Sequence, residues 1–212
     1  MKALIIGATG ATGKGLVQIL LNDPDYTAVV IFVRRASGIT HPKLSEIITD
    51  FDKLEAVAEQ IKGDVWFSCL GTTLKAAGSK EKQWHIDYEI PLKFAAIARR
   101  NGIPATVLLS AYGASTTSNV FYSKMKGRLE ESIDALAFDQ YIIFRPGLLL
   151  RKDTDRFGER IMSGLLNFVN TLGLFKKFRP LPTLLLAEKL AKAPKVFTTQ
   201  KQVIELDKIF GL

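Results

Sequence analysis

Three glycines stand three residues apart near the start of the chain, at Gly7, Gly10 and Gly13. A short apolar run, residues 2–6, precedes them, and apolar residues recur at helical spacing after them. Strand, glycine turn and helix in this order predict a pyrophosphate site for a dinucleotide, at the positive end of the helix dipole. Gly7 would permit the sharp turn, Gly10 a close approach to phosphate, and Gly13 close packing of helix on strand. The alternative interpretation is a flexible loop that is merely rich in glycine.

Two adjacent arginines, Arg34 and Arg35, follow a β-branched run at residues 27–33. The end of the second strand is where the adenosine ribose lies in a dinucleotide-binding fold. An acidic residue there would bind a free 2′-hydroxyl, whereas guanidinium groups suit a 2′-phosphate through charge-assisted hydrogen bonds. The pair therefore predicts a preference for NADP(H) over NAD(H). The alternative is that both arginines are simply exposed to solvent.

The size and composition of the chain fit one globular domain spanning residues 1–212. A chain of 212 residues with 47% hydrophobic and 24% charged residues can bury one good core. No apolar run approaches the ~20 residues needed to cross a bilayer, and the first apolar run is too short for a signal peptide. Cys69 is the only cysteine, so no disulfide within the chain is expected. A cytoplasmic location is expected.

The formal net charge of +8 comes from short, separate groups of basic residues. No basic run with interleaved aromatic residues occurs, so the sequence does not favour binding to nucleic acid. His41 and His85 are the only histidines, and neither has a second histidine or cysteine at ligand spacing. No metal site is predicted.

Strand-like and helix-like segments alternate along the rest of the chain. This alternation predicts an α/β fold, a doubly wound and mostly parallel sheet of the Rossmann type. Asp50 ends the third strand, and either flanks an adenine ring or caps the next helix. Gly71 and Thr72 follow a buried strand, which contains Cys69 as an inert core thiol, and should face the cofactor. The expected strands are residues 27–33, 44–49, 65–70, 105–109 and 141–144, and the expected helices 52–61, 85–100, 161–175 and 184–193. Residues 203–206 are expected to form either a short final strand or the start of a helix.

Tyr122 and Lys126 are four residues apart in a predicted helix that Ser118 and Asn119 can cap, so both lie on one helical face. A nearby ammonium stabilises a phenolate, and the tyrosine can then exchange a proton with a substrate oxygen. Ser110 ends the fifth strand twelve residues before Tyr122, where it can hydrogen-bond the same oxygen. A tyrosine–lysine pair alone is weak evidence, because an aromatic core residue beside an exposed lysine gives the same pattern.

Together with the glycine turn, these residues resemble the short-chain dehydrogenases/reductases, which share a Rossmann fold and a Ser-Tyr-Lys constellation. More closely, the chain is similar to the atypical, NADPH-binding group of Tat-interacting oxidoreductase-like proteins. The sequence departs from these patterns at Ala111, where a second serine is frequent, and at Ile86 and Asp87, where many relatives place an asparagine. The matching segments are colinear and comprise residues 7–13, 33–35, 50–51, 69–73, 77–78, 108–110, 122–127, 138–139, 141 and 144–149.

The resemblance implies a role for each matching residue. The turn would line the phosphates, Arg34 and Arg35 would bind the 2′-phosphate, and the backbone near Leu149 would approach the carboxamide. Tyr122 would be the general acid/base, Lys126 its electrostatic partner, and Ser110 the donor to the substrate oxygen. The implied cofactor-binding residues are Gly7, Thr9, Gly10, Ala11, Thr12, Gly13, Arg34, Arg35, Asp50, Leu70, Gly71, Thr72, Tyr122, Lys126, Pro146 and Leu149.

The segment 151–182 would form a small lid over a small-molecule substrate, although an amphipathic helix for a membrane surface or a partner is the alternative. The sequence thus predicts an NADP(H)-dependent oxidoreductase that acts on a small carbonyl, alcohol or activated double bond. The alternative is a non-catalytic protein that binds NADPH as a sensor or scaffold and regulates a partner. The sequence leaves the substrate, the direction of the reaction and the oligomeric state open.

Overall fold

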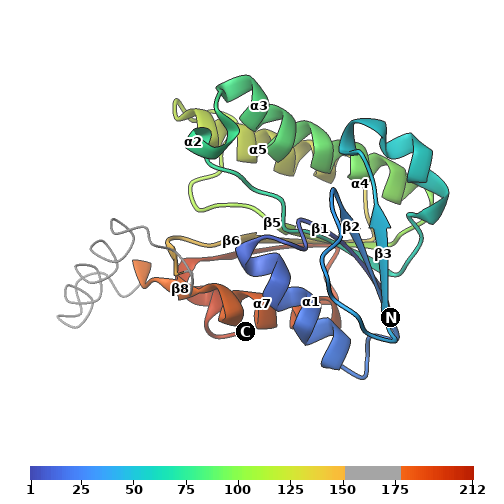
Figure 1. The fold of residues 1–212 in the computed structure, drawn as a ribbon. Coiled ribbons are helices and arrows are strands. Elements are labelled where there is room, and N and C mark those ends of the chain that lie inside the picture. Colours follow the sequence, from blue (N-terminus) through green and yellow to red (C-terminus); the bar gives the residue numbers. More distant parts are fainter. Residues whose placement is uncertain (151–177) are drawn as a thin grey trace.

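The computed structural model describes residues 1–150 and 178–212, and its centre is a seven-stranded parallel sheet (Figure 1). The strands lie in the order β3-β2-β1-β4-β5-β6-β9, and every neighbouring pair is parallel. This sheet confirms the predicted doubly wound Rossmann fold. The strands are β1 (Lys2–Ile6), β2 (Ala28–Val33), β3 (Leu44–Ile48), β4 (Val65–Ser68), β5 (Ala105–Leu109), β6 (Gln140–Arg145) and β9 (Lys201–Glu205).

Helices cover both faces of the sheet, as Figure 1 shows. On one face α1 (Ala11–Asn22) packs along α7 (Thr183–Val196); α1 buries leucine and valine side chains there, and α7 buries leucine and alanine side chains. On the other face α4 (Ile90–Arg100) and α5 (Phe121–Asp134) cover a second apolar cluster that includes Trp66 and Phe94. Because both faces are covered, the strands are apolar along nearly their whole length.

The order of the strands reverses beside β1, since the chain first builds β1-β2-β3 outward and then returns to place β4 on the other side of β1. At such a switch point the loops after two neighbouring strands leave in opposite directions and open a crevice. The glycine turn follows β1, and residues 69–73 follow β4. The fold therefore brings these two segments together at the carboxyl edge of the sheet.

Several short elements complete the described chain. The segment between β4 and α4 folds into α2 (Leu74–Ala77), α3 (Lys80–Trp84) and a π-helical turn, His85–Glu89, that continues into α4. A 3₁₀ helix, Phe51–Gln60, follows β3, and another, Leu206–Ile209, follows β9. The pair β7 (Leu149–Leu150) and β8 (Leu181–Pro182) forms a separate two-stranded sheet. None of the described helices is long and apolar enough to cross a membrane.

Three local predictions were wrong. Residue Val120, and neither Ser118 nor Asn119, is the N-cap of α5; the Ser118 hydroxyl accepts the Val120 amide instead, at 3.1 Å. Strand β4 ends at Ser68, so Cys69 lies just beyond it. The helix expected at residues 52–61 is a 3₁₀ helix kinked at Lys53. The first two differences arise at the end of an element, where short-range hydrogen bonds decide the boundary. The apolar segment 161–175 and most of the expected lid lie outside the described residues.

Candidate functional site

The glycine turn has a geometry that only glycine can supply at two of its positions. Gly7 has a φ of +79°, and a Cβ there would stand 2.5 Å from the carbonyl carbon of Cys69. A Cβ on Gly13 would stand 2.1 Å from the carbonyl oxygen of Gly7. The Gly10 amide closes the turn by donating to that same oxygen at 3.0 Å. The turn thus presses the first turn of α1 directly against the end of β1.

The N-terminus of α1 fits a phosphate group. Gly10 is the N-cap and supplies no side-chain hydrogen bond to the first turn of the helix, whose early amides have no partner within the helix. No acidic residue lies in that turn to compete with an anion. Bare amides at the positive end of a helix form a binding site for phosphate, so the residues present fit the pyrophosphate of a nicotinamide dinucleotide.

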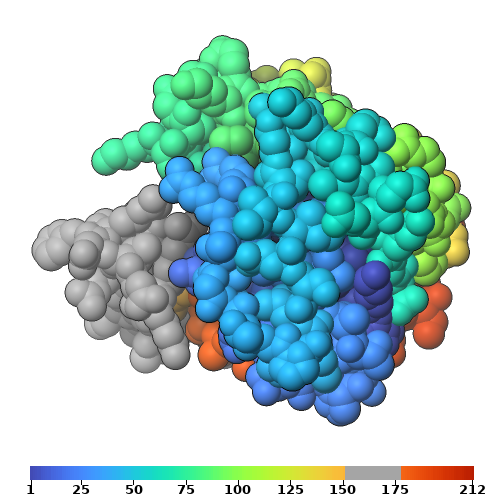
Figure 2. All heavy atoms as spheres, turned by 45° about the vertical axis from the view of Figure 1, so that its right-hand side comes forward, coloured from blue at the N-terminus to red at the C-terminus, as the bar shows by residue number. Residues whose placement is uncertain are grey.

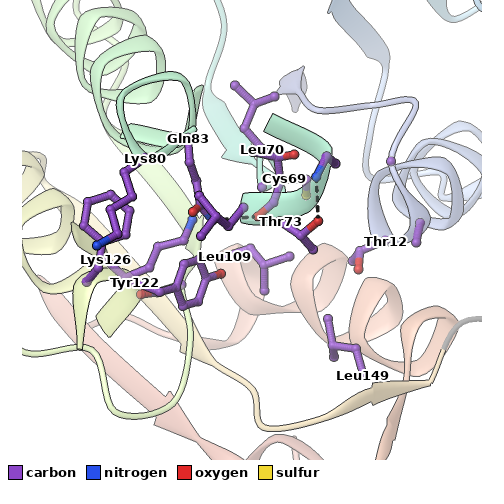
Figure 3. Close-up of a pocket in the computed structure, with 18 of the residues that line it drawn as sticks. Thr12, Cys69, Leu70, Thr73, Lys80, Gln83, Leu109, Tyr122, Lys126 and Leu149 are labelled. Carbon is purple, nitrogen blue, oxygen red and sulfur yellow. Dashed lines mark hydrogen bonds between the residues drawn. The ribbon is translucent and has the colours of Figure 1, made fainter. Parts of the chain in front are cut away.

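One cavity of about 690 Å³ joins this turn to the predicted catalytic residues (Figure 3). Its walls come from the start of α1, from the segment after β4 through α3, from the end of β5, and from the first turns of α5. In Figure 3 Thr12 lies at one end of the view and Lys80 at the other, with Tyr122 between them. The lining residues are Gly10, Ala11, Thr12, Cys69, Leu70, Gly71, Thr72, Thr73, Leu74, Ala76, Lys80, Gln83, Leu109, Ser110, Val120, Phe121, Tyr122, Lys126 and Leu149.

Tyr122 and Lys126 lie on the face of α5 that borders the cavity. Tyr122 is half-buried, whereas Lys126 is only 2% exposed. The Lys126 ammonium lies 5.8 Å from the centre of the Tyr122 ring. The structure thus places a buried cation beside a phenol ring that borders the cavity.

Asp87 stands behind this pair, in the π-helical turn. It is fully buried; its Oδ1 accepts the Thr72 amide at 2.8 Å, and its Oδ2 lies 3.9 Å from the Lys126 ammonium. Burial raises the pKa of the Asp87 carboxyl, and Lys126 and the Thr72 amide act in the opposite direction. One carboxyl group therefore links Lys126 to the segment after β4. π-Helical turns are rare and are frequent at functional sites.

Ser110 also lines the cavity, but its hydroxyl proton is directed elsewhere. The Ser110 hydroxyl donates to Oε1 of Glu130, a buried residue two turns along α5 from Tyr122. Glu130 is paired with Arg145 at the end of β6. The sequence led us to expect that Ser110 donates a hydrogen bond to a substrate oxygen. In the structure its hydroxyl donates to Glu130 instead.

The other predicted cofactor residues do not line the cavity. Arg34 and Arg35 are exposed just after β2. Asp50 is exposed, and its side chain accepts a hydrogen bond from the Asp52 amide at 3.0 Å. It therefore caps the 3₁₀ helix, which was one of the two interpretations offered by the sequence. The Pro146 carbonyl accepts the Tyr112 amide at 2.9 Å. Gly7, Thr9 and Gly13 belong to the glycine turn itself. Gly7 packs against the backbone of Cys69, and Gly13 packs against the backbone of Gly7.

Several lining residues were not predicted from the sequence. They border the part of the cavity beyond Tyr122 and come mainly from α2, α3 and the start of α5. Figure 2 shows α2 and α3 in green, where they project from the rest of the molecule. Lys80 lies 5.6 Å from the centre of the Phe121 ring, and the Gln83 amide donates to the Thr72 carbonyl at 3.1 Å. Burial raises the pKa of the Cys69 thiol to about 12, which fits an inert thiol.

Comparison with known proteins identifies the family to which this chain belongs. The model of a family described as NAD(P)H-binding matches residues 7–170. "Protein fmp52, mitochondrial" of Emericella nidulans is 37% identical over 152 residues, which are 68% of this chain and 65% of that protein. "Protein FMP52-1, mitochondrial" of Scheffersomyces stipitis is 36% identical over 86% of this chain and 79% of its own length. "Protein HTATIP2" of Rattus norvegicus is 35% identical over 69% of this chain and 62% of its own length.

Solved structures agree on the fold. A short chain dehydrogenase family protein from Francisella tularensis superposes with a TM-score of 0.69 at 17% identity, over 99% of this chain and 98% of that one. MoeE5, solved in complex with UDP-glucuronic acid and NAD, superposes with a TM-score of 0.74 at 16% identity, over 97% of this chain and 76% of that one. The matched region is slightly less than two thirds of the Emericella protein. The chain belongs to the NAD(P)H-binding family, and it has the fold of the short-chain dehydrogenases/reductases that its sequence resembles.

Proposed function

We propose that this protein is an NADP(H)-dependent oxidoreductase that acts on a small carbonyl, alcohol or activated double bond. The observation that supports the proposal most is the single cavity that contains both the phosphate-binding turn and the Tyr122–Lys126 pair. A dinucleotide whose phosphates lie on the start of α1 can extend along the cavity toward Tyr122, with the segment after β4 at its side. A substrate would then lie beyond it, next to α2, α3 and Phe121.

The catalytic groups have separate tasks in this proposal. A bound nicotinamide supplies or accepts the hydride. Tyr122 donates a proton to the substrate oxygen during reduction and takes one back during oxidation. Lys126, buried beside the phenol, stabilises the phenolate, and Asp87 holds the ammonium in place from behind. Leu74, Val120 and Phe121 give the cavity an apolar wall on the substrate side.

The proposal is tested by measuring NADPH oxidation with a panel of small aldehydes, ketones and quinones, and NADP⁺ reduction with the matching alcohols. Turnover of at least one compound is expected, with loss of that turnover in the Tyr122 variant described in the Discussion. Tight binding of NADPH without turnover of any compound would instead favour a sensor or scaffold that regulates a partner.

The preference for NADP(H) is a prediction that rests on two exposed guanidinium groups. Replacement of Arg34 or Arg35 by alanine is expected to weaken NADPH binding about 10- to 100-fold, because a charge-assisted hydrogen bond contributes about 1.5–3 kcal/mol, while NADH binding changes less than about twofold. Isothermal calorimetry with both cofactors measures the difference. Arg99→Ala serves as a control, since Arg99 lies in the last turn of α4 and pairs with Asp139 at 3.3 Å. Equal weakening of both cofactors would exclude a 2′-phosphate site at these arginines.

The location in the cell is a separate prediction. The sequence led us to expect the cytoplasm, whereas the two fungal relatives carry "mitochondrial" in their names. Fractionation of cells that express the tagged protein would distinguish the two compartments.

A further inference from the structure

A buried network behind the cavity determines how the hydroxyl of Ser110 is used. Ser110 is 5% exposed, lines the cavity, and donates its hydroxyl proton to Oε1 of Glu130. Glu130 is also 5% exposed. The amide of Ser110 donates to the Phe144 carbonyl at 2.8 Å as part of the pairing of β5 with β6. Both hydrogen atoms of Ser110 that can form hydrogen bonds are therefore engaged within the protein.

The direction of the hydrogen bond between Ser110 and Glu130 follows from Arg145. The Arg145 Nε donates to both carboxylate oxygens of Glu130, at 3.0 and 3.2 Å, and its Nη2 donates to Oε2. The hydrogen bond to Glu130 raises the pKa of Arg145 above its ordinary value, and the bond from Nη1 to Glu205 at 2.7 Å adds to this. An ionised carboxylate carries no proton and can only accept. The proton between Ser110 and Glu130 therefore belongs to the serine.

A serine hydroxyl has one proton and two lone pairs. Since this proton points at Glu130, Ser110 can offer the cavity only lone pairs. We propose that Ser110 recognises a hydroxyl group of the substrate as a hydrogen-bond acceptor, and that Glu130, held by Arg145, is the positioning residue that fixes this polarity. This rests on the proposed function, in which the substrate lies in this cavity beside Tyr122.

The proposal narrows the class of substrate. A plain carbonyl oxygen accepts a hydrogen bond from Tyr122 but finds no donor in Ser110. Tyr122 needs the proton of a reacting alcohol, so the hydroxyl that donates to Ser110 is a second one, carried next to the reacting carbon. The site therefore selects carbonyl compounds and alcohols with such a neighbouring hydroxyl over simple aldehydes, ketones and alcohols. In this proposal Ser110 accepts a hydrogen bond from the substrate, whereas the sequence led us to expect that it donates one.

Neutron diffraction from crystals grown in heavy water tests the polarity directly. A deuteron bound to Ser110 Oγ and pointing at Glu130 Oε1, with no deuteron on the carboxylate, is the expected result. A deuteron on Ser110 that points into the cavity, or one carried by Glu130, would overturn the proposal. This experiment requires no substrate, so it distinguishes a wrong polarity from a protein that has no oxidoreductase activity.

Ligand-observed NMR on the NADP⁺-bound protein tests the selection itself with two matched compounds whose carbonyl groups cannot be reduced there, 2-hydroxyacetophenone and acetophenone. Ser110→Ala is expected to weaken binding of the hydroxy-ketone about tenfold, the effect of one lost hydrogen bond, and to leave the ketone within about twofold. A greater loss for the ketone, or no loss for either compound, would contradict the proposal.

Glu130→Gln tests the positioning role. Its amide oxygen would face Arg145 and its NH₂ group would donate to Ser110, which frees the serine proton to point into the cavity. The preference for the hydroxy-ketone over the ketone should then disappear or reverse. Glu131→Gln is the matched control, since Glu131 is the next residue of α5, is exposed, and accepts the Thr116 hydroxyl at 2.9 Å outside the network. If Glu130→Gln does not fold, as shown by circular dichroism, Ser110→Ala carries the test alone.

Discussion

Replacement of Tyr122 by phenylalanine is expected to lower kcat by about 10²- to 10⁴-fold, the usual contribution of a positioned general acid or base. The ring remains, so the contact with the Lys126 ammonium and the shape of the cavity are preserved. Only the hydroxyl that exchanges a proton with the substrate is lost. NADPH affinity is therefore expected to stay within about threefold of the unaltered protein, a difference smaller than that of one hydrogen bond.

Steady-state kinetics with the best compound from the substrate panel, together with calorimetry for NADPH, measures both effects. Tyr88→Phe is the matched control, because the Tyr88 hydroxyl is partly buried, bonds to Ser132 Oγ at 3.1 Å and does not line the cavity. That variant should keep its turnover within about threefold, as expected for a surface-side hydrogen bond. Full activity in Tyr122→Phe would remove the tyrosine from the mechanism and direct attention to another proton donor.

Local patterns predicted the fold well because its elements follow from local physics. The spacing of glycines and apolar residues at positions 2–21 predicts a strand, a turn and a helix. The structure has β1, the turn and α1 in that order. The strand expected at residues 105–109 matches β5, and the one expected at residues 44–49 differs from β3 by a single residue. Strands that are buried on both faces give continuous apolar runs, which are easy to locate in a sequence.

The contacts behind the cavity could not be predicted in the same way. Asp87 meets Lys126 only because β4, the π-helical turn and α5 converge in space. The sequence showed Asp87 only as a departure from an expected asparagine. Which carboxylate lies next to a buried lysine depends on tertiary packing, and spacing along the chain does not encode it.

Glu130 did leave a usable signal. It follows Lys126 by four residues, so it lies on the same face of α5 as Tyr122 and Lys126, one turn further along. A carboxylate on the buried face of a helix requires a partner, because burial of an unpaired charge is very unfavourable. The same reasoning would have indicated Arg145 as a candidate partner, because it is the charged last residue of a mainly apolar strand. The direction of the Ser110 proton, however, required the positions of all three side chains.

Replacement of Gly13 by alanine is expected to be the most damaging single change in the phosphate-binding turn. The new Cβ would stand 2.1 Å from the Gly7 carbonyl oxygen and 2.9 Å from the Gly7 carbonyl carbon. Both atoms belong to the main chain, so α1 has to move away from the end of β1. We expect the free energy of unfolding to fall by about 3 kcal/mol, the upper end of the usual effect of overpacking, which lowers Tm by about 6–12 °C for a chain of this size.

The same movement should weaken NADPH binding tenfold or more (about 1.4 kcal/mol), because the displaced α1 no longer points its amides at the phosphates. Gly15→Ala is the matched control, two residues further along α1. Its Cβ would meet side chains of α7, at 3.3 Å from Ala187 and 3.4 Å from Leu184, which can shift, and alanine is favoured over glycine in a helix by about 1 kcal/mol. Thermal unfolding and calorimetry should therefore find Gly15→Ala close to the unaltered protein. If Gly13→Ala proved equally stable and bound NADPH equally well, α1 would not need to lie so close to β1, and the phosphate site would have to be held by other contacts.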